Sequence, residues 1–161
     1  MRRSLIVEDI LLIEPAYKNK YPPIGLMKIA YFHRYIMHDY VRFAKGRLPE
    51  GLENKKWDRV YVTTLFTFEW ENTKKALQYA LSVVKPGGKV FTGGILATLR
   101  PEWIAKEFPT VINNTGLLRI IPNKLNDIPV DICSFRTYLI IQVRTVERGF
   151  KDLCIYHPQI L

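Results

Sequence analysis

Short apolar runs alternate with longer amphipathic segments along the first part of the chain. Residues 9–15, DILLIEP, hold four consecutive large aliphatic side chains, a pattern typical of a strand that is buried on both faces of a sheet. A polar, proline-bearing loop follows. Residues 25–35 then place apolar side chains and His33 at spacings of three and four, which predicts an amphipathic helix with His33 on the same face.

The same order recurs downstream. Residues 39–43 are a weaker strand candidate, whereas residues 58–66, DRVYVTTLF, are the clearest one because they are rich in β-branched and aromatic side chains. Residues 70–84 carry an apolar helix face that ends before KPGG. Residues 89–94, KVFTGG, predict another strand, and Pro101 suits the start of another helix. TVINNTG and LLRII are candidates for the last strand and its exit.

Strands that alternate with helices indicate an α/β fold, an open parallel sheet with helices on both faces in three layers, because parallel neighbours need crossover connections. Such sheets bind ligands beyond the carboxyl ends of their strands. The loops EPAYKNKYPP, TTLFTFEWENT and GGILAT follow predicted strands. We therefore expect any ligand site at this edge.

The length and composition fit one globular domain with its own core. The chain has 161 residues, of which 48% are hydrophobic and 24% charged. Its formal charge of +9 favours anionic partners, but the basic residues are scattered, as on a solvated surface. Nucleic acid is an unlikely partner, because no recognisable binding motif with exposed aromatics accompanies the charge.

The chain contains two cysteines, Cys133 and Cys154, which lack the spacing of a metal site or a disulfide scaffold. Reduced thiols in a cytoplasmic protein are the simplest interpretation. Glu8, Asp9 and Glu14 interrupt the first apolar stretch, so neither a signal peptide nor a membrane span is expected.

Three motifs, YPPIGLMKIA, TTLFTFEWENT and GGILATLRPE, resemble in order and spacing the amino-terminal cobalamin-binding-like domain of radical S-adenosylmethionine proteins. The resemblance covers roughly residues 8–131, because LNDIPVD is similar to the linker that follows that domain. It gives a domain of residues 1–131 and a divergent tail of residues 132–161. It implies a flavodoxin-like (Rossmann-like) sheet that binds a corrinoid or a nucleotide-like ligand.

The resemblance also implies binding residues. Hydroxyl groups would come from four threonines and close backbone approach from two glycines: Thr63, Thr64, Thr67, Thr98, Gly93 and Gly94. A glycine has no Cβ, so it permits close ligand contact or a positive φ. Gly93 and Gly94 can equally form only a tight turn, and both interpretations stay open at this point.

The chain departs from the family in two motifs. Asp-x-His-x-x-Gly, whose histidine ligates cobalt, is absent, and so is the Cys-x-x-x-Cys-x-x-Cys that holds an iron–sulfur cluster. No catalytic residues, metal ligands or iron–sulfur cluster are therefore expected, and the chain is not expected to be an enzyme on its own. A radical S-adenosylmethionine partner subunit would have to supply any catalysis.

Two alternatives to ligand binding follow from the same sequence. The domain is either a ligand-free protein-interaction module or a truncated remnant of a cobalamin-dependent radical S-adenosylmethionine protein. For the interaction module, TYLIIQVRTV in the tail reads as an extra strand that could pair with a sheet edge or a second copy in a homo-oligomer.

Overall fold

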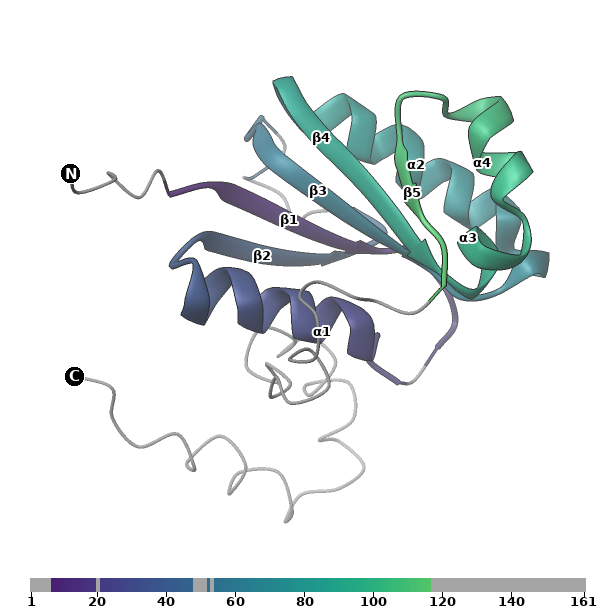
Figure 1. The fold of residues 1–161 in the computed structure, drawn as a ribbon, viewed down its shortest axis with the longest axis horizontal. Helices are drawn as coiled ribbons and strands as arrows, with labels where there is room; N and C mark the ends of the chain where they lie inside the picture. Colours follow the sequence, from purple (N-terminus) through teal and green to yellow (C-terminus); the bar gives the residue numbers. More distant parts are fainter. Residues whose placement is uncertain (1–6, 20, 48–51, 53, 117–161) are drawn as a thin grey trace, which may run out of the picture.

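The computed structural model describes residues 7–19, 21–47, 52 and 54–116. Within these ranges the chain forms one sheet of five parallel strands in the order β2-β1-β3-β4-β5 (Figure 1). This order is that of a flavodoxin-like open sheet, so the predicted fold class is confirmed. The strands are β1 (Asp9–Glu14), β2 (Tyr40–Lys45), β3 (Trp57–Thr64), β4 (Val84–Gly94) and β5 (Ile112–Asn114).

Helices cover both faces of the sheet and complete the three layers. Helix α1 (Ile24–Tyr31) and the π-helical turn η1 (Phe32–Ile36) lie on one face, which we call the α1 face. Helix α2 (Trp70–Val83) and the short helices α3 (Ile95–Leu99) and α4 (Pro101–Glu107) lie on the other, the α2 face. A 3-10 turn, η2 (Thr67–Glu69), leads into α2.

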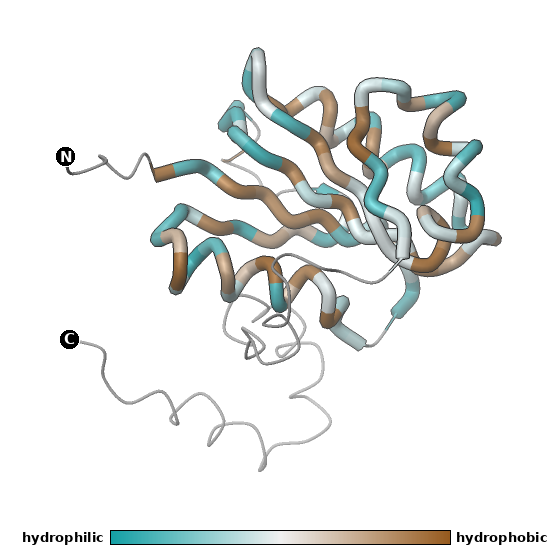
Figure 2. Tube along the Cα trace, viewed as in Figure 1, coloured by the Kyte–Doolittle hydropathy of each residue, from teal (hydrophilic) through white to brown (hydrophobic). Residues whose placement is uncertain are grey.

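Strand β1 lies at the centre of the core. Its four central aliphatic side chains are fully buried, and Figure 2 shows β1 as a hydrophobic stretch between more mixed strands. Successive strand residues point to opposite faces. Accordingly, Ile10 and Leu12 pack with α1, whereas Leu11 and Ile13 join the larger cluster under α2.

The structure differs from the sequence prediction at the start of β4. The strand begins at Val84 rather than at Lys89, so KPGG lies within it instead of forming a turn after the helix. The pairing of β3 with β4 changes register between Trp57 and Arg59. The backbones approach so closely at this irregularity that a Cβ on Gly88 would lie 2.7 Å from the Asp58 carbonyl oxygen. Glycine therefore permits the strand to continue where we expected a break.

The helix expected over residues 25–35 also changes character within that range. It is α-helical to Tyr31 and then continues as the π-helical turn η1. The turn is closed by a hydrogen bond of 3.0 Å from the Met37 amide to the Phe32 carbonyl oxygen. A π-helical turn accommodates one residue more than a regular helical turn.

Other predictions fall partly outside the described residues. Strand β5 lies within TVINNTG, whereas LLRII, the strand expected over residues 137–146 and the tail of residues 132–161 all lie outside them. No helix of the described ranges is both long and apolar enough to cross a bilayer.

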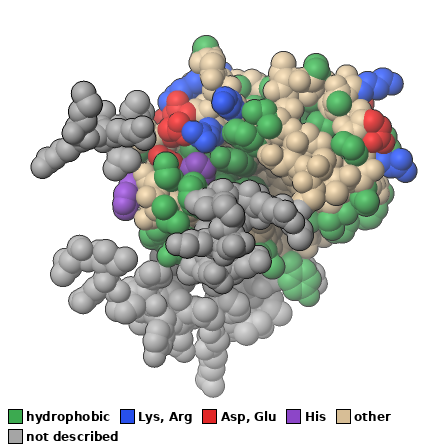
Figure 3. Space-filling model, in the orientation of Figure 1, with side chains coloured by type: hydrophobic (Ala, Val, Ile, Leu, Met, Phe, Trp, Pro, Cys, Tyr) green, Lys and Arg blue, Asp and Glu red, His purple; other side chains and the backbone are tan. Residues whose placement is uncertain are grey.

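Ion pairs connect the amino ends of three strands. The Lys85 ammonium lies 2.7 Å from Asp58 and 3.1 Å from Asp9, and Lys55 lies 2.7 Å from Asp9. Burial alone would raise the pKa of both carboxyl groups, but the lysine hydrogen bonds outweigh it and lower each pKa below its ordinary value. Figure 3 shows acidic, basic and histidine side chains gathered near this edge.

Next to these ion pairs, a buried imidazole links α1 to the sheet. His33 Nδ1 lies 2.7 Å from Asp39 Oδ2, and His33 Nε2 lies 3.0 Å from the Tyr61 hydroxyl oxygen. Burial lowers the pKa of His33 despite the neighbouring carboxylate of Asp39. The neutral ring then donates to Asp39 and accepts from Tyr61, so both ring nitrogens are occupied.

Candidate functional site

The carboxyl ends of the strands meet at one edge of the sheet, as parallel pairing requires. All six residues expected to bind a ligand lie at this edge or in the turns and helices that follow it. The structure does not bring them onto one surface. Instead it divides them among a buried joint, a second joint at the exposed Thr98, the α1 face and a cleft on the α2 face.

Thr64 and Gly94 form the buried joint between β3 and α3. The Thr64 hydroxyl donates to the Gly93 carbonyl oxygen and accepts from the Ala97 amide, each at 3.0 Å, and the residue is fully buried. Gly94 has a φ of +118°, and a Cβ there would overlap the Thr64 carbonyl oxygen. The structure therefore gives both residues a packing role, close to the tight-turn interpretation of the glycine pair.

Thr98 forms a second internal joint. Its hydroxyl donates to the Gly94 carbonyl oxygen at 2.8 Å and accepts from the Gly116 amide at 2.9 Å. The Asn113 side-chain amide donates to the Ala97 carbonyl oxygen at 3.1 Å. These bonds hold β5 and the segment after it against α3. Thr98 therefore fixes the position of that segment, although its side chain is exposed.

Thr63 and Gly93 lie side by side on the α1 face. They are register partners, and Gly93 pairs in turn with Asn114 of β5. Within the described residues the Thr63 hydroxyl makes no hydrogen bond. Two residues toward the amino ends, Tyr61, Phe91 and Ile112 form a parallel apolar row on the same face, in which the Tyr61 and Phe91 rings stack at 4.9 Å. Thr63, Gly93 and Asn114, which we call the polar row, thus border an apolar surface.

Glu14 extends the polar row to β1. It follows Ile13, which pairs with Val62, so Glu14 occupies the position beside Thr63. Its side chain is fully buried, neither carboxyl oxygen has a hydrogen-bond partner, and Lys45 Nζ lies 3.7 Å from Oε2. Burial raises the pKa of Glu14 to about 7, although Lys45 and Asn19 act in the opposite direction.

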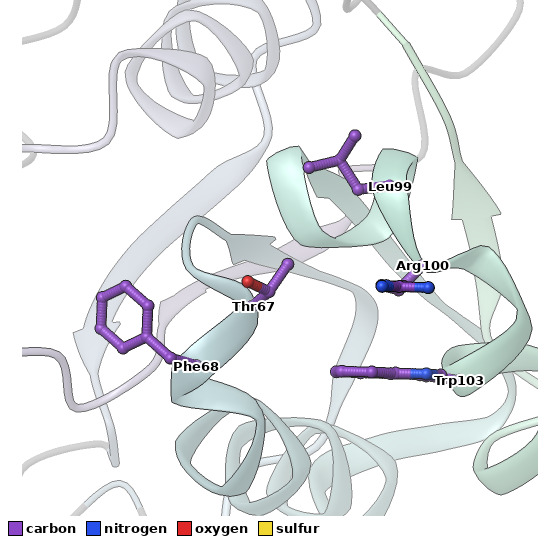
Figure 4. A pocket seen from close by; sticks show the side chains of 5 residues that line it. All are labelled: Thr67, Phe68, Leu99, Arg100 and Trp103. Carbon is purple, nitrogen blue, oxygen red and sulfur yellow. The ribbon is translucent and has the colours of Figure 1, made fainter.

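Thr67 lies away from the polar row, in a cleft on the α2 face. This cleft has a volume of about 520 Å³ and is lined by Thr67, Phe68, Leu99, Arg100 and Trp103. In Figure 4, Thr67 faces Leu99, Arg100 and Trp103 across the opening, whereas the Phe68 ring lies on the other side of Thr67 and points away from them. The Arg100 guanidinium stacks over the Trp103 ring at 5.5 Å, and Phe68 and Leu99 are 81% and 62% exposed. The cleft therefore combines apolar walls with one cation.

Sequence reasoning missed Glu14, Asn114, Arg100 and Trp103. A signal for Glu14 was present, because its spacing of two and four from Leu12 and Ile10 places it on the same buried face of β1. Asn114 was included only as part of a strand candidate. No sequence pattern indicated that Arg100 and Trp103 line a cleft, because the cleft depends on how α3 and α4 are packed relative to η2.

No imidazole lies at this edge among the described residues. His33 is held by Asp39 and Tyr61 near the amino ends, and His38 directly precedes that cluster along the chain. The described ranges also contain no group of three histidine, cysteine or acidic side chains placed to hold a metal ion.

Comparison with known proteins gives no family assignment. No protein-family model matches the chain, and a search of curated proteins finds no similar sequence.

Proposed function

We propose that this domain binds a corrinoid or another ligand with a nucleotide-like tail at the carboxyl edge of its sheet, on the α1 face. Thr63, Gly93 and Asn114 are the contact residues. The strand order supports this location, because the chain direction across the sheet reverses between β1 and β3. Ligands of open α/β sheets bind outside the strand ends at such a reversal.

The observation that carries the proposal is the polar row itself. Three neighbouring strands place a hydroxyl, a bare backbone and an amide in register at one edge. A Cβ on Gly93 would lie 3.3 Å from the Asn114 carbonyl oxygen, so a side chain there would crowd the space between Thr63 and Asn114. Hydroxyl and amide groups beside a bare backbone suit the hydrogen-bonding groups of a ligand.

Cobalamin fits the row only through its polar tail. The row can supply hydrogen bonds and close backbone contact, but no described histidine lies near enough to this edge to act as a cobalt ligand. The chain's own residues would therefore bind and orient the tail. Cobalamin would bring its cobalt chemistry with it, without an imidazole from the described residues.

The proposal is tested with two coloured probes, hydroxocobalamin and flavin mononucleotide. Each is mixed with the purified protein, desalted and measured by visible absorption. Thr63→Val keeps the side-chain volume but removes the hydroxyl, so we expect at least a tenfold weaker retention of the bound probe, about 1.4 kcal/mol. Thr67→Val, which alters the cleft instead, is the matched control and should retain the probe.

The outcomes separate the two surfaces. Loss of the probe in Thr67→Val but not in Thr63→Val would move the ligand to the cleft. If the wild-type protein retains neither probe, the proposed function is wrong for both ligand classes.

A second candidate function is protein association through the cleft. Phe68 stacks on Phe66 with ring centroids 5.1 Å apart, yet it remains largely exposed and, like the exposed Leu99, lines the cleft. Exposed apolar side chains around one cleft often mark interaction sites. If two copies associate here, replacing Phe68 and Leu99 by serine should convert a dimer to a monomer in light-scattering measurements. A wild-type protein that is monomeric at all concentrations tested would reject self-association.

A further inference from the structure

Glu14 is the most unusual buried group among the described residues. A carboxyl group with no exposed surface and no hydrogen bond of ordinary geometry is costly when ionised, because Lys45 and Asn19, which favour the charged form, replace only part of its lost hydration. Buried polar groups in folded proteins almost always have a partner, and each exception requires an explanation. Lys45 offsets only part of this cost, since its ammonium is 3.7 Å away.

A short segment, residues 15–19, follows Glu14, and we call it the strap. The Tyr17 hydroxyl is 2.7 Å from the Thr73 hydroxyl on α2, and its ring meets Phe66 edge-on at 5.7 Å. Near the other end of the strap, Lys45 Nζ donates to the Asn19 carbonyl oxygen at 3.0 Å. The strap is thus tied both to α2 and to β2, the strand next to β1.

One of the bonds that attach the strap involves the cation next to Glu14. Lys45 contacts both the carboxyl group and the strap backbone. When Glu14 is neutral, its burial requires no counter-charge. When it ionises, the negative charge gains most by reaching water. Asn19 of the strap acts directly on the carboxyl group, so we infer that the strap moves away when the carboxylate becomes hydrated.

We propose that Glu14 and the strap form a proton-controlled latch, closed over the β1 end while the carboxyl group is neutral and opened when it ionises. Opening exposes Glu14 next to Thr63 and so enlarges the polar row. The latch goes beyond the proposed function, because it operates without any ligand.

Of Glu14 and Tyr17, only Glu14 is expected to change its protonation state near pH 7. Lys45 on β2 and Asn19 on the strap are the described side chains that act on its pKa. Glu14 in turn contributes to the raised pKa of Tyr17 on the strap. Burial raises the pKa of Tyr17 above its ordinary value of 10.0, so Tyr17 stays neutral near pH 7. The closed state raises the pKa of Glu14 from 4.5 to about 7, which places the transition between these two values.

Hydrogen exchange of the full chain tests the latch. Exchange of the strap amides is measured at pH 5 and pH 8 and divided by the intrinsic rate at each pH. We expect protection of the strap to fall on the order of 50-fold from pH 5 to pH 8, the ratio that follows from the two pKa values. Amides within β3 serve as an internal control and should not change.

Two variants decide between the latch and other causes. Glu14→Gln cannot ionise, so its strap protection should not depend on pH. Tyr17→Phe loses the bond to Thr73, so the strap should open more at both pH values while the pH ratio is kept. Equal wild-type protection at pH 5 and pH 8 would overturn the latch, as would a pH effect that persists in Glu14→Gln. If Glu14→Gln does not fold, a midpoint of strap opening near pH 4.5 in Tyr17→Phe overturns it instead.

Discussion

At the amino edge of the sheet, Asp9 and Asp58 share the ammonium group of Lys85, whereas at the carboxyl edge Glu14 is buried without a hydrogen bond. Both edges belong to the same three strands, but one stabilises ionised carboxylates and the other disfavours them. The pKa values of Asp9 and Asp58 are lowered and that of Glu14 is raised. The amino edge, with its close ion pairs, is suited to holding the strands together. The carboxyl edge, where Glu14 has only the more distant Lys45 as a counter-charge among the described residues, is suited to responding to its surroundings.

The two edges therefore give stability opposite dependences on pH. Asp9 and Asp58 contribute stability that is present above their unfolded pKa of 3.8 and is lost as the pH falls through their lower folded values. Glu14 contributes stability that is present below its unfolded pKa of 4.5 and is lost as the pH rises through about 7.

The largest expected effect comes from the backbone of the carboxyl edge. Gly94→Ala would place a Cβ onto the Thr64 carbonyl oxygen at a φ of +118°. We expect the free energy of unfolding to fall by at least about 3 kcal/mol in urea denaturation. Gly87→Ala is the control toward the amino ends, because Gly87 has a φ of +80° but open space around it, and it should cost only about 1 kcal/mol. Equal costs would show that the joint at Thr64 is not rigid.

The next effect isolates Glu14. Relative to Glu14→Gln, the wild-type protein should lose about 3 kcal/mol of unfolding free energy between pH 4.5 and pH 8, because its carboxyl group ionises earlier in the unfolded chain. Urea denaturation across this range measures the difference. Parallel pH profiles for the two proteins would mean that Glu14 is not buried as a neutral acid.

A smaller effect is expected from the ion pairs at the amino edge. Lys85→Met keeps the aliphatic part of the side chain but removes both contacts to Asp9 and Asp58. Because these groups are partly exposed, the cost should be about 1 kcal/mol and should shrink as salt is added. The pKa of each aspartate, followed by NMR, should rise toward its ordinary value. A cost that does not depend on salt would argue for lost packing instead.

The smallest effect is expected at the cleft. Phe68 is 81% exposed, so Phe68→Ser should change the unfolding free energy by no more than about 0.5 kcal/mol. Leu77→Ala, at a fully buried position of α2, is the contrasting control and should cost about 3 kcal/mol. A large cost for Phe68→Ser would show that its ring supports the fold rather than a binding surface.

Much of the fold was predictable because the local spacing of apolar residues indicates which side chains are buried. The uninterrupted aliphatics of β1 indicated a strand covered on both faces, and the spacing of Ala76, Leu77 and Ala80 indicated the buried side of α2. The start of β4 was not predictable, because KPGG breaks a helix in most settings. Its place in a strand depends on the close approach of Gly88 to β3.

The candidate site was less predictable than the fold. The sequence correctly placed Thr63 and Thr64 at the carboxyl edge of the sheet. Because they are adjacent in one strand, their side chains were already expected to point to opposite faces. The sequence could not reveal that the Thr64 hydroxyl would be occupied by the Gly93 carbonyl and the Ala97 amide. The state of Glu14 depends on the pairing of β1 with β2 and on the strap, both of which are tertiary features.

The π-helical turn η1 has a consequence for how the sheet is assembled. Its additional residue lengthens the path from α1 to β2 without lengthening the α-helix itself. If one residue were deleted there, the turn would revert to regular helix and β2 would keep its register, with Val41 still pointing inward. The wide turn can therefore absorb the loss of one residue without changing which side chains of the outermost strand face the core.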